Sequence, residues 1–163
     1  TDVPLTEEGE AAARRLAERL AGREFALVLT SPMQRARETA RLAGFGDRAE
    51  VDEDLRERDY GDYEGVTTKE VRKTIPGWDV WYDEVPNGET LAQVGARADR
   101  VIERGLAVDG DTLIFAHGHF LRIVGARWIG MGPEGGGRLV VETATLCALG
   151  FERERRVLRR WNS

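Results

Sequence analysis

An arginine and a histidine, Arg35 and His117, each follow a short apolar segment of the sequence. Residues 25–32 read Phe-Ala-Leu-Val-Leu-Thr-Ser-Pro and lead to Arg35, and residues 112–116 read Thr-Leu-Ile-Phe-Ala and lead to His117 and Gly118. In a parallel α/β sheet, strands of this kind end at one edge, where the first N–H groups of the following helices favour anions. An arginine and a histidine at that edge predict a phosphate site.

The chain has only two histidines, His117 and His119, and both allow a second interpretation. The ring of His117 can face the ligand side of the sheet, or it can be a hydrogen-bonded structural histidine. Together, the two histidines also form a His-x-His pair, which is a pattern found in metal sites. Carboxylates alone would have to complete the ligand set, so we expect no metal.

Acidic side chains are concentrated in residues 54–65, which read Asp-Leu-Arg-Glu-Arg-Asp-Tyr-Gly-Asp-Tyr-Glu-Gly. A carboxyl group beside a phosphate could protonate a leaving alcohol. On its own, the segment fits a solvated charged loop equally well, just as Arg35 alone fits a surface charge. A run of arginines near the C-terminus could attract anions, but we interpret it as the charged protection of an edge strand: these are residues 153, 155, 156, 159 and 160.

The surrounding pattern predicts the elements that hold these side chains. Helical spacing or helix signals occur after Thr6, after Pro32, over residues 90–106 and after Gly118, and short apolar runs typical of buried strands separate them. Residues 145–151 and 155–161 predict a hairpin or edge pair. This alternation predicts one domain over residues 1–163, a three-layer α/β/α fold with a mostly parallel central sheet.

Residues 61–88 do not fit the alternation. They hold aromatic residues among glycines and prolines and suggest an excursion over the edge of the sheet. We leave two interpretations open: a flap whose aromatic side chains contact a ligand, and a satellite hydrophobic cluster under a long loop.

Composition limits the classes of function. The net charge of −5 argues against a protein that coats nucleic acid or anionic lipid, and no apolar run has the length of a membrane span. Cys147 is the only cysteine, so no intrachain disulfide can form, which fits a cytoplasmic location. We expect Cys147 to be a small buried residue rather than a reactive thiol.

Five short motifs, in this order, make the chain resemble the histidine phosphatase superfamily, which has the phosphoglycerate-mutase-like fold. The motifs are Pro4-Leu5-Thr6 with Gly9, Ser31-Pro32 with Arg35-Ala36 and Thr39-Ala40, Leu55 and Glu57 with Gly61 and Glu64-Gly65, Gly88-Glu89-Thr90, and His117-Gly118 with Arg122. The sequences of residues 59–65 and 115–122 are most similar to those of bacterial acid phosphatases and of fungal sugar-bisphosphatase relatives.

The resemblance implies a role for each matched residue. Arg35, Gly118 and His119 would bind the phosphate, and His117 would stabilise the charge on the transferred phosphoryl group. Glu57 would donate a proton to the leaving oxygen and later activate water.

The resemblance also implies a nucleophilic histidine in an Arg-His-Gly turn at the end of the first strand, which becomes a phosphohistidine. Neither histidine of this chain lies in such a turn. We therefore expect the first strand, the nucleophile and one more phosphate-binding arginine to precede Thr1, and we expect residues 1–163 alone to be inactive.

Only 60 positions separate Glu57 from His117, whereas mutases of the superfamily carry a long insertion there. This favours a compact, metal-independent phosphomonoesterase without a cofactor, which acts on a small phosphorylated metabolite such as a sugar phosphate. A cofactor-dependent phosphoglycerate mutase is the alternative among enzymes. An inactive member that binds phosphorylated ligands or a protein is the alternative from another class. The sequence does not define the natural substrate or the oligomeric state.

Overall fold

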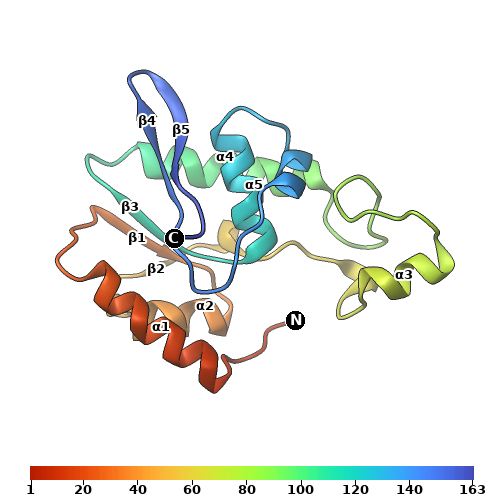
Figure 1. Ribbon diagram of the computed structural model, residues 1–163, viewed down its shortest axis with the longest axis horizontal. Helices are drawn as coiled ribbons and strands as arrows, with labels where there is room; N and C mark the ends of the chain where they lie inside the picture. Colours follow the sequence, from red (N-terminus) through yellow and green to blue (C-terminus); the bar gives the residue numbers. More distant parts are fainter.

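The central sheet has three parallel strands in the order β2-β1-β3 (Figure 1). The computed structural model describes all of residues 1–163. β1 (Leu27–Thr30) pairs on one side with β2 (Glu50–Val51) and on the other with β3 (Thr112–Phe115). Thr30 lies opposite Phe115, so β1 and β3 end level with each other, and the residues that follow them meet at one edge of the sheet.

Two helices cover each face of this sheet, as the alternation predicts (Figure 1). α1 (Glu7–Leu20) and α2 (Gln34–Leu42) pack on the face to which Val28 points. α4 (Leu91–Leu106) and α5 (Gly118–Trp128) pack on the other face, where Leu29 belongs to the larger hydrophobic core. Adjacent residues of β1 therefore enter two different cores, which explains why the strand is apolar throughout. The three-layer prediction is confirmed.

Local signals explain where the helices begin. The side chain of Thr6 accepts a hydrogen bond from the Gly9 N–H at the start of α1. Thr90 and Gln93 form a reciprocal capping box at the start of α4. The buried residues of α4 recur at helical spacing and form the stripe that packs on α5: Val94, Ala98, Val101 and Ile102.

The C-terminal residues form the predicted hairpin. β4 (Ala148–Glu152) and β5 (Arg155–Arg160) are antiparallel and are not hydrogen-bonded to the main sheet. The indole N–H of Trp128 in α5 donates to the carbonyls of Gly150 and Val157, at 3.2 and 3.1 Å, and so joins the hairpin to the helix. A 3-10 segment, η3 (Pro133–Arg138), lies between α5 and this part of the chain.

Residues 61–88 extend away from the sheet, beyond α4 and α5 (Figure 1). They contain η2 (Gly61–Tyr63) and the short helix α3 (Thr68–Thr74). Val71, Trp78 and Val85 form a separate small core. The segment thus contains the expected satellite cluster, and contact of its aromatic side chains with a ligand stays a prediction.

One expectation differs from the structure. Cys147 is exposed rather than buried, because it lies just before β4 in residues 139–147, which form no helix or strand. The expected strand before Thr1 stays a prediction. None of the helices is long and apolar enough to cross a membrane.

Candidate active site

A short connection carries Glu57 to the edge of the sheet where the strands end. After β2, the side chain of Asp52 accepts a hydrogen bond from the Asp54 N–H and starts the 3-10 turn η1 (Glu53–Leu55). Leu55 is fully buried in the larger core. This anchor fixes the chain two residues before Glu57.

The carboxylate of Glu57 lies at the beginning of α5. It accepts hydrogen bonds from the N–H groups of His119 and Phe120, at 3.1 and 2.9 Å, and from its neighbour Arg58, at 3.0 Å. Burial raises the pKa of Glu57 and outweighs these three N–H groups, which lower it. A carboxyl group with a raised pKa holds a proton closer to neutral pH, as a general acid must.

His117 is buried and lies between the ends of two strands. Its Nε2 is 2.7 Å from the hydroxyl oxygen of Ser31, the residue that follows β1. Burial, and then the positive charge of Arg35, lower its pKa to about 4, so the ring is neutral at pH 7. The sequence motif contains Ser31, but only the level ends of β1 and β3 make it the partner of His117.

Arg35 is the second residue of α2 and is partly buried. One of its Nη atoms donates to the carbonyl of Thr1, at 2.9 Å. Its charge lowers the pKa of both His117 and Glu57, although burial remains the larger effect on each. The three predicted residues Arg35, Glu57 and His117 thus share one electrostatic environment.

His119 lies between two aromatic rings. Its Nδ1 is hydrogen-bonded to the hydroxyl of Tyr60, and its ring centroid is 4.8 Å from that of Trp81. Burial, and then the charges of Arg122 and Arg58, lower its pKa to about 4. Burial raises the pKa of Tyr60, which keeps its hydroxyl protonated as a hydrogen-bond donor. Sequence reasoning assigned no role to Tyr60 by itself, although it lies in the acidic segment.

A cleft of about 920 Å³ opens over part of this arrangement. Arg35, Glu57 and His119 line it, while His117 and Gly118 do not. Gly118 is the exposed first residue of α5. Aromatic side chains that precede or belong to the excursion form another part of the wall, namely Tyr60, Tyr63 and Trp78. The cleft therefore joins a proton donor and a cation to a partly aromatic wall, an arrangement that suits a phosphate ester with an organic leaving group.

Three arginines near the site bind backbone carbonyls. Arg58 is 3% exposed and donates to the carbonyls of Glu89 and Val80. Arg122 donates to the carbonyls of Gly136 and Gly137, and its guanidinium lies 4.4 Å from the centroid of Trp81. Burial lowers the pKa of both arginines.

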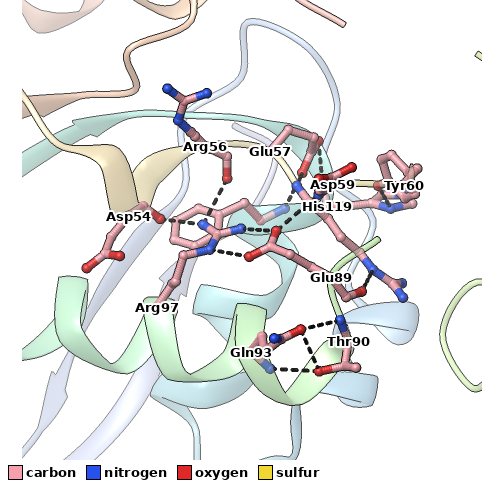
Figure 2. Close-up of polar contacts among 12 residues, drawn as sticks. Asp54, Arg56, Glu57, Asp59, Tyr60, Glu89, Thr90, Gln93, Arg97 and His119 are labelled. Atoms are coloured by element: carbon pink, nitrogen blue, oxygen red, sulfur yellow. Dashed lines mark hydrogen bonds and ion pairs between the residues drawn. The ribbon is translucent and has the colours of Figure 1, made fainter. Parts of the chain in front are cut away.

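A third arginine, Arg97 of α4, lies against the segment that carries Glu57 and forms a bidentate pair with Glu89 (Figure 2). Sequence reasoning identified Glu89 in a motif but gave no role to Arg97. No group of three or more His, Cys, Asp or Glu side chains is arranged to hold a metal ion.

Comparison with known proteins gives consistent matches over the chain. The family model of the histidine phosphatase superfamily (branch 1) matches residues 1–163. An acid phosphatase of Mycobacterium tuberculosis is 40% identical over 157 residues, which cover 93% of this chain and 76% of that protein. A sedoheptulose 1,7-bisphosphatase of Saccharomyces cerevisiae is 38% identical over 169 residues, which cover 82% of this chain and 61% of that protein.

A solved structure shows the same similarity in three dimensions. The product of an open reading frame of Mycobacterium tuberculosis superposes with a TM-score of 0.93 at 37% identity, and the superposition covers 99% of this chain and 86% of that one.

Proposed function

The chain belongs to the histidine phosphatase superfamily (branch 1), and from this premise we propose that it is a metal-independent phosphomonoesterase in which Glu57 is the proton donor. One observation carries the proposal: the carboxyl group of Glu57 is buried, has a raised pKa and lines the same cleft as Arg35. A phosphate ester of an ordinary alcohol leaves as a poor alkoxide unless it receives a proton. The raised pKa of Glu57 and its place on the cleft support it as the donor of that proton.

In this proposal, Arg35 and His117 stabilise the negative charge of the phosphoryl group. Arg35 lies in the first turn of α2 and faces the cleft, where its guanidinium can bind two phosphate oxygens. The charge of Arg35 acts on His117, and we assign the His117 ring a hydrogen bond to a third oxygen as the transition state forms. Positive and polar side chains thus supply the stabilisation that a metal ion supplies in other phosphatases, which supports metal independence.

The reaction proceeds in two steps through a phosphohistidine. A histidine nitrogen forms a bond to phosphorus while the bond from phosphorus to the leaving oxygen breaks, and Glu57 gives its proton to that oxygen. Water then attacks phosphorus, Glu57 takes a proton from it, and the bond between nitrogen and phosphorus breaks. The family motif of the nucleophile is an Arg-His-Gly turn, which contains neither His117 nor His119, so we assign the nucleophile to a third histidine, in a segment before Thr1.

The substrate is a small phosphorylated metabolite. The cleft of about 920 Å³ has the size of small-molecule sites, and its wall includes both aromatic rings and carboxylates such as Asp59 and Glu64. Carboxylates bind hydroxyl groups, and aromatic rings contact the apolar faces of sugars. A sugar phosphate fits these features, and the sedoheptulose bisphosphatase among the relatives supports this class.

Release of inorganic phosphate from a panel of esters tests the proposal. The panel contains an aryl phosphate, several sugar phosphates and bisphosphates, and both monophosphoglycerates. With the protein that includes the proposed histidine-bearing segment, we expect hydrolysis of the aryl phosphate and of at least one sugar phosphate, with rates that a chelator does not change. Brief exposure to substrate followed by alkaline quenching should leave one phosphate on histidine, detected by mass spectrometry.

Other results would select a different function. Interconversion of the phosphoglycerates without phosphate release would show a mutase. Activity that a chelator abolishes and a divalent ion restores would end the claim of metal independence. Saturable binding of phosphate esters without turnover would indicate a binding protein.

A further inference from the structure

Arg97 uses almost all of its hydrogen-bonding capacity within the protein. Its Nε and one Nη donate to the two carboxylate oxygens of Glu89, at 2.9 and 2.8 Å. The other Nη donates to the carbonyls of Asp54 and Arg56, at 2.6 and 3.0 Å (Figure 2). Four of the five N–H groups of a guanidinium are thereby engaged. Arg97 lines the cleft, but it has little capacity left for a phosphate.

Glu89 binds the chain on the C-terminal side of Glu57. Its carboxylate accepts the N–H of Asp59, at 3.0 Å, and its backbone exchanges two further bonds with the same segment. The Glu89 N–H donates to the carbonyl of Asp59, at 2.9 Å, and the Glu89 carbonyl accepts from the side chain of Arg58, at 3.1 Å.

Arg97 and Glu89 together hold the chain on both sides of one residue. They bind the backbone of Asp54 and Arg56 before Glu57, and the backbone of Asp59 after it. They make no contact with the carboxylate of Glu57, which accepts N–H groups of α5 and of Arg58 instead. Arg97 and Glu89 thus hold the backbone of residues 54–59, whereas the carboxylate of Glu57 bonds to other groups.

We infer that Arg97, acting through Glu89, is a positioning residue that places the carboxyl group of Glu57 for proton transfer. This inference rests on the proposed role of Glu57 as the acid. A proton donor must lie within hydrogen-bond distance of the leaving oxygen, and a misplacement of about 1 Å can cost about 10²-fold in rate. The ion pair of Arg97 with Glu89 is partly buried, and the hydrogen bonds from these two residues to the backbone of the segment set that distance from a rigid helix.

The same helix provides matched controls. Arg100 and Arg104 also extend from α4 to residues 50–54, where they pair with Asp54 and with Asp52 and Glu50. Their side chains are 56% and 40% exposed, against 12% for Arg97, and they reach only the part of the segment that precedes Leu55. Ion pairs this exposed contribute little, so loss of Arg100 should not move Glu57.

The test compares Arg97→Gln with Arg100→Gln on two substrates, an alkyl phosphate and nitrophenyl phosphate. For Arg97→Gln, we expect kcat/KM, which reports only the steps up to formation of the phosphohistidine, to fall about 10²-fold on the alkyl phosphate. On nitrophenyl phosphate it should fall less than about 10-fold, because nitrophenolate leaves without a proton. Inhibition by inorganic phosphate should stay within about twofold, because Arg97 holds no phosphate. Arg100→Gln should change none of these values more than about twofold.

Two additions separate positioning from a general structural role. In a Glu57→Gln background, Arg97→Gln should cause no further loss on the alkyl phosphate, because the acid is already absent. Arg97→Lys keeps the charge but not the bidentate geometry, and its loss should be intermediate. Equal losses on both substrates, or weaker inhibition by inorganic phosphate, would overturn the inference.

Amide hydrogen exchange tests the positioning role of Arg97 without a measurement of enzyme activity. Arg97→Gln should speed exchange at the three N–H donors to Glu57, which belong to Arg58, His119 and Phe120, and Arg100→Gln should not. Unchanged protection at these amides in Arg97→Gln would refute the positioning role. A wild-type protein without phosphatase activity would instead contradict the proposed function, and the exchange result would still stand.

Discussion

The carboxyl group of Glu57 combines two features that favour proton donation to a poor leaving group: burial that raises its pKa, and N–H groups that orient it. We predict that Glu57→Gln slows hydrolysis of sugar and other alkyl phosphates about 10²-fold or more, and of nitrophenyl phosphate much less. The glutamine keeps the size of the side chain but has no proton to give at this pH. The difference is measured as kcat/KM for both substrates, because kcat/KM excludes the later water step that the two substrates share.

Glu64 is the control carboxylate in the same cleft. Burial acts to raise its pKa, but hydrogen bonds, first of all from the Tyr60 N–H, outweigh it and lower the pKa. An ionised carboxylate cannot act as the acid, so Glu64→Gln should affect both substrates alike. If Glu57→Gln reduces both rates equally and Glu64→Gln shows the leaving-group dependence, the roles of the two residues must be exchanged.

His117 is predicted to contribute to the transition state rather than to substrate binding alone. His117→Ala should lower kcat about 10²-fold or more, the usual scale for a lost transition-state hydrogen bond. Ser31→Ala removes only the partner of the ring and should cost less. Melting temperatures of the variants identify losses caused by misfolding. A small kinetic effect of His117→Ala together with a large fall in melting temperature would make His117 a structural histidine.

Sequence reasoning selected candidate residues for the site better than it selected their partners. Arg35, Glu57 and His119 were selected from the motifs, and the structure places all three on the cleft. The bond between His117 and Ser31 required the register of β1 against β3, which no local pattern contains. Arg97 is one of many arginines, and only the rotation of α4 about its axis turns it toward Glu89.

At the level of elements, the acidic segment and the end of the aromatic excursion pack closely at Gly61 and Gly88, and each glycine lies against the backbone of the other segment. Gly61 has a φ of +47°, and a Cβ there would collide with the carbonyl oxygen of Pro86. A Cβ on Gly88 would lie 2.6 Å from the carbonyl oxygen of Asp59. No residue larger than glycine fits this contact without moving the backbone next to Glu57.

We predict that Gly61→Ala lowers the free energy of unfolding by at least about 2 kcal/mol, since it combines left-handed strain with a backbone collision. Gly65→Ala is the matched control. Gly65 also has a positive φ, of +74°, but a Cβ there would meet nothing within 4 Å, so the expected cost is about 1 kcal/mol. Chemical denaturation measures both. Equal losses would show that the backbone can shift to admit the methyl group.

The regular elements were predictable because each carried its own signal, and the irregular ones were not. Apolar runs and caps predicted β1, α4 and the hairpin to within a few residues. The short helix α3 has its capping box, but it lies in a segment whose aromatic residues pack on each other and not on the sheet. Its position depends on contacts such as that between the rings of Tyr63 and Trp78, whose centroids are 5.3 Å apart. The spacing of residues along the sequence does not reveal such contacts.

For the whole molecule, the titration of buried groups predicts how stability depends on pH. Burial lowers the pKa of His117 and His119 from the ordinary 6.5 to about 4. Between these two pKa values, the unfolded chain binds more protons than the folded one. The contribution of the neutral histidines to the free energy of unfolding is therefore fully present above about pH 7 and falls as the pH drops toward 4. Glu57 acts in the opposite direction, because its raised pKa makes its burial less costly at low pH.

We therefore predict a loss of about 2 to 3 kcal/mol in the free energy of unfolding between pH 7 and pH 5, after allowance for the partial exposure of His119. The double variant His117→Gln, His119→Gln should remove most of this slope, because neither glutamine can gain a proton. Below about pH 4.5, a second loss should follow in both proteins, as carboxylates whose pKa is lowered by arginines, such as Asp54 beside Arg100, become protonated. Urea denaturation at a series of pH values measures both phases. A wild-type slope between pH 7 and pH 5 that persists unchanged in the double variant would show that other groups cause the acid sensitivity, and that the two histidines are accessible to protons in the folded protein.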